Sequence, residues 1–327
     1  MQKHSKKEKL LTVTSNYNLN LSQNEIEFVD VPLELDLPCF INPFAIKNSK
    51  DKLIMKMSYL LNKHFKHMLD LIKDSKQKEA LMLIEGFSEK NTRGIHLGYS
   101  TDKNGKSIGP EKAKAIYNAF NNSVAVKTGK LNDIEECTLL LENVSYDIIS
   151  DIILSICKKP LLEFTINQSK KYSLKTRPFN IKVLNENSKW VYKEFNLPYN
   201  FESKEDYILL VPKNIVIHNP KLTNARAYSF IWEKLKYSKN ITNKELNLAL
   251  VMTLDDNILE KPTTKKEFKN SIPESKEIIV KFFGLNPNQL KLIMNRYNLI
   301  GNSLYDANAE IANAYNALFK RFHDIAA

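Results

Sequence analysis

The chain has 327 residues, of which 43% are hydrophobic and 26% are charged, and it carries a formal net charge of +11. This composition is typical of a globular protein and excludes a disordered or fibrous one. No apolar run reaches the length of about 18 residues that a membrane helix needs, and the first residues lack the apolar core of a signal peptide. We therefore expect a cytoplasmic protein without a membrane partner.

The cysteines agree with this compartment. Cys39, Cys137 and Cys157 are far apart in the sequence and odd in number. They form neither a metal-binding spacing nor a disulfide framework, which suits a reducing cytosol.

The positive charge has two explanations. A basic protein of pI about 9.2 can bind the phosphate backbone of a nucleic acid. The excess charge is mostly lysine, however, and arginine, which commonly reads bases, is scarce. A solvated lysine-rich surface is therefore the other explanation, and the sequence leaves both open.

The first third of the chain predicts a leader, an extended segment and a long helix. Residues 1–24 are polar and predict a loosely held leader. Residues 25–46 alternate in polarity and contain three prolines, which favours an extended segment. Apolar residues at helical spacing then predict an amphipathic helix over 50–75 with lysines on its other face. On that helix, His64 and His67 are either a packed pair or two metal ligands without a third.

The middle of the chain mixes both types of element. "KEALMLIEGF" (78–87) predicts a strand or a short helix, and "TRGIHLGYS" (92–100) predicts a strand. The glycines of "TDKNGKSIGP" (101–110) belong to an ordinary loop or to a phosphate cradle, and Pro110 begins a helix. The apolar run "CTLLLENV" (137–144) predicts a buried strand, followed by an isoleucine-rich helix to about Cys157.

The last third changes from strands to helices. "FNIKVL" (179–184) and "YILLVPKNIVI" (207–217) predict strands, the second apolar enough for the centre of a sheet. Beyond Pro220 the periodicity is helical throughout. We therefore predict a mixed α/β (α+β) core with a mixed sheet over 25–218, followed by an all-helical region over 219–327.

The final helix has an additional pattern. Apolar or amide residues follow steps of four and three over 302–325: Leu304, Asn308, Ile311, Tyr315, Leu318, Phe322 and Ile325. Such a seam packs either on the chain's own helices or on a second copy of the chain, as in a homodimer.

Two aspartates in "VSYDIISDIILSI" (144–156) raise the question of a site, since Asp147 and Asp151 are four residues apart on one helix face. One interpretation makes Asp147 the N-cap of this helix and places Asp151 in its first turn, where acids are favoured. The other combines both with Glu85 and Glu136, near the ends of predicted elements, as ligands of Mg²⁺ or Mn²⁺. Lys213 would then stabilise charge on a phosphoryl group, so that Asp147, Asp151 and Lys213 would be catalytic.

Several separated motifs resemble a family of prokaryotic proteins found in restriction and phage-defence neighbourhoods. These motifs are "LDLPCFINPF", "LGYS", "YDIISD" and "LLVPK", and the likeness covers roughly residues 29–216. The family patterns D-x-P-L-F-I-D-P, L-G-Y-S and G-x-D-x-I-S-D mark Asp36, Gly98, Tyr99, Ser100, Asp147, Ser150 and Asp151. Asn42 replaces the second acid of the first pattern, and Ser145 stands where glycine is usual. The C-terminal helix is also similar to one that precedes restriction-type nuclease domains.

The resemblance implies a role in anti-phage defence. Together with the basic charge and the carboxylates, it predicts a protein that acts on nucleic acid, with metal-dependent nuclease activity as the leading mechanism. The alternative is a non-enzymatic sensor or adaptor that binds a partner defence protein or a phage component.

Overall fold

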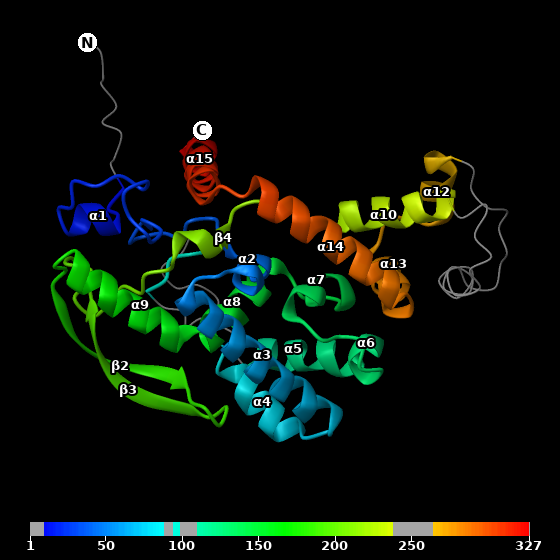
Figure 1. Ribbon diagram of the computed structural model, residues 1–327, viewed down its shortest axis with the longest axis horizontal. Coiled ribbons are helices and arrows are strands. Elements are labelled where there is room, and N and C mark those ends of the chain that lie inside the picture. Colours follow the sequence, from blue (N-terminus) through cyan, green and yellow to red (C-terminus); the bar gives the residue numbers. More distant parts are fainter. Residues whose placement is uncertain (1–9, 88–93, 99–109, 238–263, 327) are drawn as a thin grey trace, which may run out of the picture.

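The computed structural model describes residues 10–87, 94–98, 110–237 and 264–326. Helices dominate, and the strands form two small antiparallel sheets of two strands each. The helices that follow residue 223 lie together on one side of the molecule (Figure 1). The predicted class, a mixed α+β core followed by a helical region, is confirmed. The predicted mixed sheet is wrong for the described residues, whose two sheets are small and purely antiparallel.

The extended segments pair sparingly. After the short helix α1 (Val13–Asn16), β1 (Phe40–Ile41) pairs with β4 (Val216–Ile217) in the first sheet. Residues 207–211, predicted as a central strand, are buried and extended, but they form only single bridges and isolated backbone hydrogen bonds. One of these joins the Val29 N–H to the Val211 carbonyl, 2.9 Å apart. Burial was therefore predicted correctly, whereas a regular strand over this run was not.

The second sheet is a long hairpin. β2 (Thr176–Leu184) and β3 (Trp190–Pro198) pair along their whole length, which confirms the predicted strand at 179–184. The helix α9 (Lys158–Lys171) packs on this hairpin (Figure 1). The Trp190 indole N–H also donates to the Leu83 carbonyl at 3.1 Å, which joins the hairpin to a second helix.

The longest helix of the core begins at a side-chain cap, whereas α4 (Gln77–Glu85) and α6 (Val124–Lys127) begin without one. The Asp51 carboxylate accepts hydrogen bonds from the first turn of α3 (Lys52–Lys73), whose apolar face is buried as predicted. The run 78–87 forms a helix, α4 (Gln77–Glu85), and Pro110 begins α5 (Pro110–Asn122), which leads to α6 (Val124–Lys127). Of the two interpretations of His64 and His67, packing describes His64, which is buried with its Nδ1 2.8 Å from the Ser188 hydroxyl.

The run "CTLLLENV" begins as a helix and continues as a turn, so the predicted strand at 137–144 is wrong. It forms α7 (Cys137–Leu140), directly after the 3₁₀ turn η2 (Ile134–Glu136). The side chains of Asp133 and Glu136 form a capping box that begins this turn. A short apolar run has no periodicity that separates a buried strand from a buried helix, and here the capping residues decided between them.

The helical region contains α10 (Asn224–Tyr237), α12 (Lys265–Ser271), α13 (Lys276–Leu285), α14 (Pro287–Leu304) and α15 (Ala307–Ala326). Residues 238–263 of the predicted helical region lie outside the described residues. Ile311 and Leu318 of the predicted seam are 1% and 4% exposed within this chain's own core. Glu310 accepts hydrogen bonds from the His218 and Asn219 N–H groups, which holds α15 beside β4. The seam thus packs internally over these positions, and a contact with a second copy stays a prediction.

Membrane helices and cysteine pairing were also considered in the sequence, and the structure describes both. In the described ranges, no helix is both long enough and apolar enough to cross a membrane. All three cysteines are buried and unpaired.

Candidate functional site

The site begins at the N-terminus of α8 (Tyr146–Ile156). Ser145 is the N-cap of this helix, and its Oγ accepts a hydrogen bond from the Ile148 N–H at 3.3 Å. Asp147 therefore lies in the first turn and Asp151 one turn further on, so the interpretation of Asp147 as the N-cap is wrong by two positions. A first-turn carboxylate is favoured by the helix dipole. Asp147 does not cap the helix, so its carboxylate oxygens are available for other contacts.

The second part of the site is a crossing of two extended segments. The Leu37 N–H donates to the His96 carbonyl at 2.9 Å, and the Gly98 N–H donates back to the Leu37 carbonyl at 3.0 Å. Leu37 and Leu97 form a parallel bridge. These bonds place Asp36, the residue before Leu37, beside Gly98.

Asp36 and Asp147 face the same point in space. A Cβ atom on Gly98 would lie 3.6 Å from Asp147 Oδ1 and 3.7 Å from Asp36 Oδ2. Both aspartates are half-buried, and Gly98 is buried. Because Gly98 has a φ of +140°, a conformation that L-residues rarely adopt, glycine is needed here for its backbone rather than for space. The fold thus brings together carboxylates that are more than a hundred positions apart in the sequence.

Two neighbouring residues support this arrangement. The buried hydroxyl of Ser150 accepts a hydrogen bond from the Ile41 N–H at 3.0 Å, which ties α8 to β1. Asp151 is half-buried and shares the helix face of Asp147. The motif positions Tyr99 and Ser100 lie outside the described residues.

The two positions at which this chain departs from the motifs that it resembles, Asn42 and Ser145, are both helix caps. The Asn42 side chain accepts a hydrogen bond from the Phe44 N–H at 3.1 Å and so caps α2 (Pro43–Asn48). Ser145 caps α8 in the same way. Aspartate and glycine, the residues of the pattern, are also good N-caps. We infer that these two positions serve the fold, and that the carboxylates to consider for chemistry are Asp36 and Asp147.

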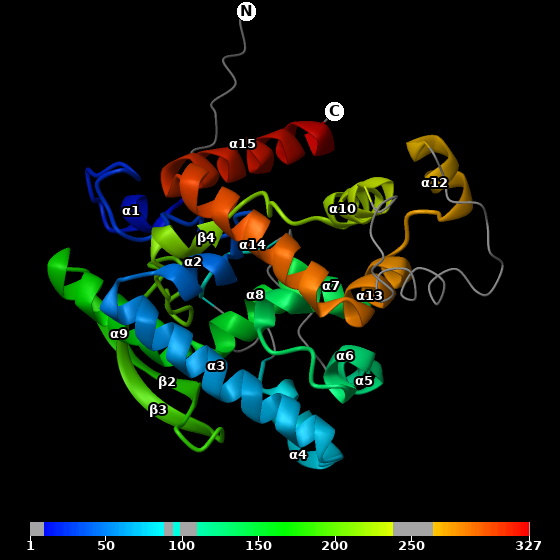
Figure 2. The same cartoon turned by 45° about the vertical axis from the view of Figure 1, so that its right-hand side comes forward.

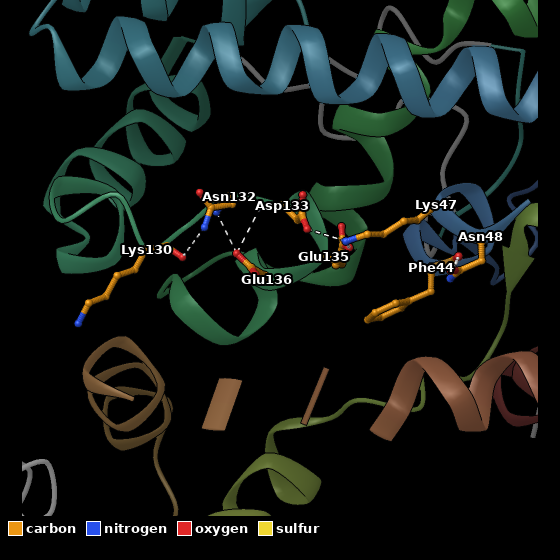
Figure 3. Close-up of polar contacts among 8 residues, drawn as sticks. All are labelled: Phe44, Lys47, Asn48, Lys130, Asn132, Asp133, Glu135 and Glu136. Atoms are coloured by element: carbon orange, nitrogen blue, oxygen red, sulfur yellow. Dashed lines mark hydrogen bonds and ion pairs between the residues drawn. The ribbon is translucent and has the colours of Figure 1, made fainter. Parts of the chain in front are cut away.

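Two other predicted site residues, Glu136 and Lys213, are engaged in structural contacts. Figure 3 shows Glu136, whose carboxylate accepts hydrogen bonds from the Asn132 N–H at 2.9 Å and the Asp133 N–H at 3.3 Å. Burial raises the pKa of Glu136. The Lys213 amine donates to the carbonyls of Gln23 and Asn24, at 3.1 and 3.2 Å.

The predicted carboxylate set is therefore not gathered into one cluster. Glu85 is exposed at the end of α4. Among the described residues, no group of three or more histidine, cysteine, aspartate or glutamate side chains is placed to hold a metal ion. The metal role of Glu85, Glu136, Asp147 and Asp151 stays a prediction, and the geometry favours a smaller set built on Asp36 and Asp147.

Beside Glu136 lies an ion-pair cluster that the sequence did not indicate. The Lys47 amine contacts Asp133 Oδ2 at 2.5 Å and Glu135 Oε1 at 2.6 Å (Figure 3). Glu135 is 7% exposed, and burial raises the pKa of its carboxyl. This cluster joins α2 to η2 and has a structural explanation.

Together these features define a mixed α+β domain in which two half-buried carboxylates converge at the N-terminus of a helix. Residues 18–224 match the model of a domain of unknown function, DUF8370, and the chain belongs to this family. The matched segment contains Asp36, Gly98 and Asp147 and ends where α10 begins. No curated protein and no solved structure matches the chain.

Proposed function

We propose that this protein is a cytoplasmic anti-phage defence protein that acts on nucleic acid, and that it hydrolyses phosphodiester bonds with a divalent metal ion held by Asp36 and Asp147. The convergence of these two carboxylates beside Gly98 carries the proposal. The defence role rests on the resemblance of the motifs to proteins of phage-defence neighbourhoods, and three motif positions are the ones that converge.

Two carboxylates suit a particular class of cation. Mg²⁺ usually keeps several water molecules and takes only one or two protein carboxylates beside the phosphate of its substrate. Such an ion polarises a phosphoryl oxygen and makes a bound water a better nucleophile. Asp151, on the same face of α8, is the next carboxylate along the helix and can orient a metal-bound water. The proposal leaves out Lys213, because its amine is bound to the N-terminal segment.

The test compares carboxylate variants on several nucleic acids. Purified full-length protein is incubated with single- and double-stranded DNA and RNA in the presence of Mg²⁺, Mn²⁺ or EDTA. We expect cleavage that needs a divalent ion and falls about a hundredfold or more in Asp36→Asn and Asp147→Asn. Asp74→Asn is the matched control, since Asp74 is an exposed carboxylate in a surface ion pair with Lys76.

The same variants are expected to remain folded. Their melting temperatures should stay close to that of the wild type or rise, because a removed carboxylate no longer repels its neighbour when metal is absent. Cleavage that persists in EDTA, or full activity in both aspartate variants, would disprove metal-dependent hydrolysis at this site.

A non-enzymatic sensor or adaptor is the second candidate function. Two hollows in the described part of the chain have volumes of about 30 and 190 Å³. Small-molecule sites usually measure about 300–1,000 Å³, so neither of these two hollows has the usual size of one. Cells expressing wild type or Asp147→Asn are challenged with phage and plaques are counted. Full protection by Asp147→Asn, with no cleavage by either protein, would favour the adaptor.

A further inference from the structure

The exposed face of α3 is a basic stripe. Its residues follow steps of four and three along the helix, so that they project from one side, with the exposed Asp70 at the position between the last two: Lys52, Lys56, Tyr59, Lys63, Lys66 and Lys73. Apart from Lys63, which is half-buried, these side chains are exposed. Figure 2 shows α3 in the front of the molecule, between α9 and α4. We call this set the α3 stripe.

The charges around the stripe leave an excess of lysine. Asp70 is the only acid of α3 itself. Glu163 of α9 and Glu186 of the hairpin turn pair with Lys56 and Lys63 at 2.6 and 2.9 Å. These ion pairs are solvent-exposed, contribute little to stability and can exchange for a phosphate.

Three amines of the stripe have no such partner. Lys52, Lys66 and Lys73 form no hydrogen bond or ion pair through their side chains with the residues that the structure describes. Lys73 also lines the hollow of about 190 Å³, together with Lys127 and without any carboxylate. The stripe therefore ends in a second concentration of positive charge.

An exposed aromatic ring interrupts the lysines. Tyr59 is 62% exposed, and the Lys63 amine lies 6.0 Å from the centre of its ring. Met55, one turn earlier, is 55% exposed. Leaving large apolar side chains exposed gives up the free energy of burying them. The core does not need them, because α3 has a complete buried apolar face without them. Tyr59 thus offers a flat apolar surface in the middle of a cationic one.

We propose that the α3 stripe binds single-stranded nucleic acid, with lysines on the phosphates and Tyr59 stacked on an unpaired base. Lys52, Tyr59, Lys66 and Lys73 are seven residues apart, or about 10 Å at the rise of an α-helix, so the stripe is long enough for several nucleotides. Aromatic rings between basic groups are the usual way in which proteins hold single strands without reading their sequence. The inference rests on the proposed function, whose substrate it specifies.

The experiment measures binding without cleavage. Fluorescence anisotropy of a labelled oligonucleotide of about 20 nucleotides is recorded with the full-length protein in EDTA over a range of salt concentrations. The test variant replaces Lys52, Lys66 and Lys73 with glutamine. The control replaces Lys204, Lys269 and Lys291, which are exposed elsewhere. Both variants lose the same charge. Circular dichroism melting verifies that each is folded.

We expect the stripe variant to weaken binding by about tenfold or more and to reduce the slope of log K against log salt by about 2, since each phosphate contact on a single strand contributes about 0.7. Tyr59→Ala should weaken binding by about tenfold, and Tyr59→Phe should not, because stacking needs only the ring. The control variant should bind nearly as tightly as the wild type.

Several results would overturn the inference. These are no binding by the wild type, equal losses in both triple variants, a preference for duplex, or an unaffected Tyr59→Ala. Binding of phosphatidylserine vesicles but not of oligonucleotides would assign the stripe to membranes instead. Stripe-dependent binding without any metal-dependent cleavage would retain the inference and reject the proposed hydrolysis, so the two can fail separately.

Discussion

Replacing Lys158 with methionine is expected to stabilise this protein. Lys158 is the first residue of α9 and is 1% exposed. It forms no ion pair with the residues that the structure describes. Burial, reinforced by the nearby Lys182, lowers the pKa of its amine to about 7. The positive end of the α9 dipole is a further unfavourable neighbour for a protonated amine.

The size of the effect follows from the pKa. A change from 10.5 to about 7 corresponds to about 5 kcal/mol in favour of the neutral amine in the folded state. Relaxation of the surroundings reduces this figure, and apolar replacements of buried charged groups typically gain about 1–4 kcal/mol. We expect Lys158→Met to gain an amount in this range at pH 7, because methionine fills a similar volume without a charge.

The gain depends on pH in a defined direction. As the pH falls from 10.5 to about 7, the unfolded chain takes up a proton that the folded chain does not, so Lys158 destabilises the fold increasingly. Below about 7 both states are protonated and the contribution becomes constant. The advantage of Lys158→Met should therefore be largest near pH 7 and shrink toward pH 10.

Urea denaturation at several pH values tests this directly, through the free energy of unfolding of each protein. Burial also lowers the pKa of Lys276, to about 8, which makes the stability depend on pH with the same sign. Both proteins contain Lys276, so this contribution cancels in the difference between them. Lys159→Met, one position further on, controls for the loss of a lysine. A destabilised Lys158→Met, or a difference that does not change between pH 7 and 10, would refute the reasoning.

Three further predictions concern the site and its surroundings. Ser145→Ala should lower the free energy of unfolding by about 1 kcal/mol by removing the cap of α8, whereas Asp147→Asn should change it by only a few tenths; equal effects in chemical denaturation would contradict this assignment of the cap. Gly98→Ala should lower the free energy of unfolding by about 1–3 kcal/mol, and it should abolish activity because the backbone shift displaces the carboxylates. An unchanged melting temperature would show that the φ of +140° is not required. Lys47→Met should destabilise the protein by about 1–2 kcal/mol at neutral pH because it leaves Glu135 buried without its cation. Burial raises the pKa of Glu135 and Lys47 opposes this, so removing Lys47 raises that pKa further. The folded variant therefore takes up the proton at a higher pH than the wild type, and its deficit should narrow as the pH falls; a deficit that grows in acid would contradict this role of Lys47.

Much of the local structure is determined by the sequence alone. The apolar periodicity of residues 52–73 and the preceding Asp51 specify α3, since each helical position depends on neighbours three and four residues away. The hairpin strand at 179–184 follows from its own pattern in the same way. The cap of α8 was not decided by residue type, because serine and aspartate are equally good N-caps and both Ser145 and Asp147 precede the apolar run.

Runs without periodicity were not determined in this way. Residues 137–140 became a helix because the capping box of Asp133 and Glu136 starts one just before them. The apolar residues 207–211 are buried as their composition predicts, but no neighbouring strand aligns with them for more than a bridge. Pairing partners lie far away in the sequence, so propensity cannot supply them.

The candidate site was decided by the tertiary structure. The sequence marks Asp36, Gly98 and Asp147 as separate motif positions, and it predicts metal ligands at Glu85 and Glu136 but not at Asp36. In the structure Glu85 is exposed, and Glu136 accepts hydrogen bonds from the Asn132 and Asp133 N–H groups. Only the bonds between Leu37 and the segment 96–98, and the packing of α8 on β1 through Ser150, bring the two aspartates to one point. The physical reason is that local sequence fixes backbone dihedrals over a few residues, whereas the distance between residues 36 and 147 depends on how the whole core packs.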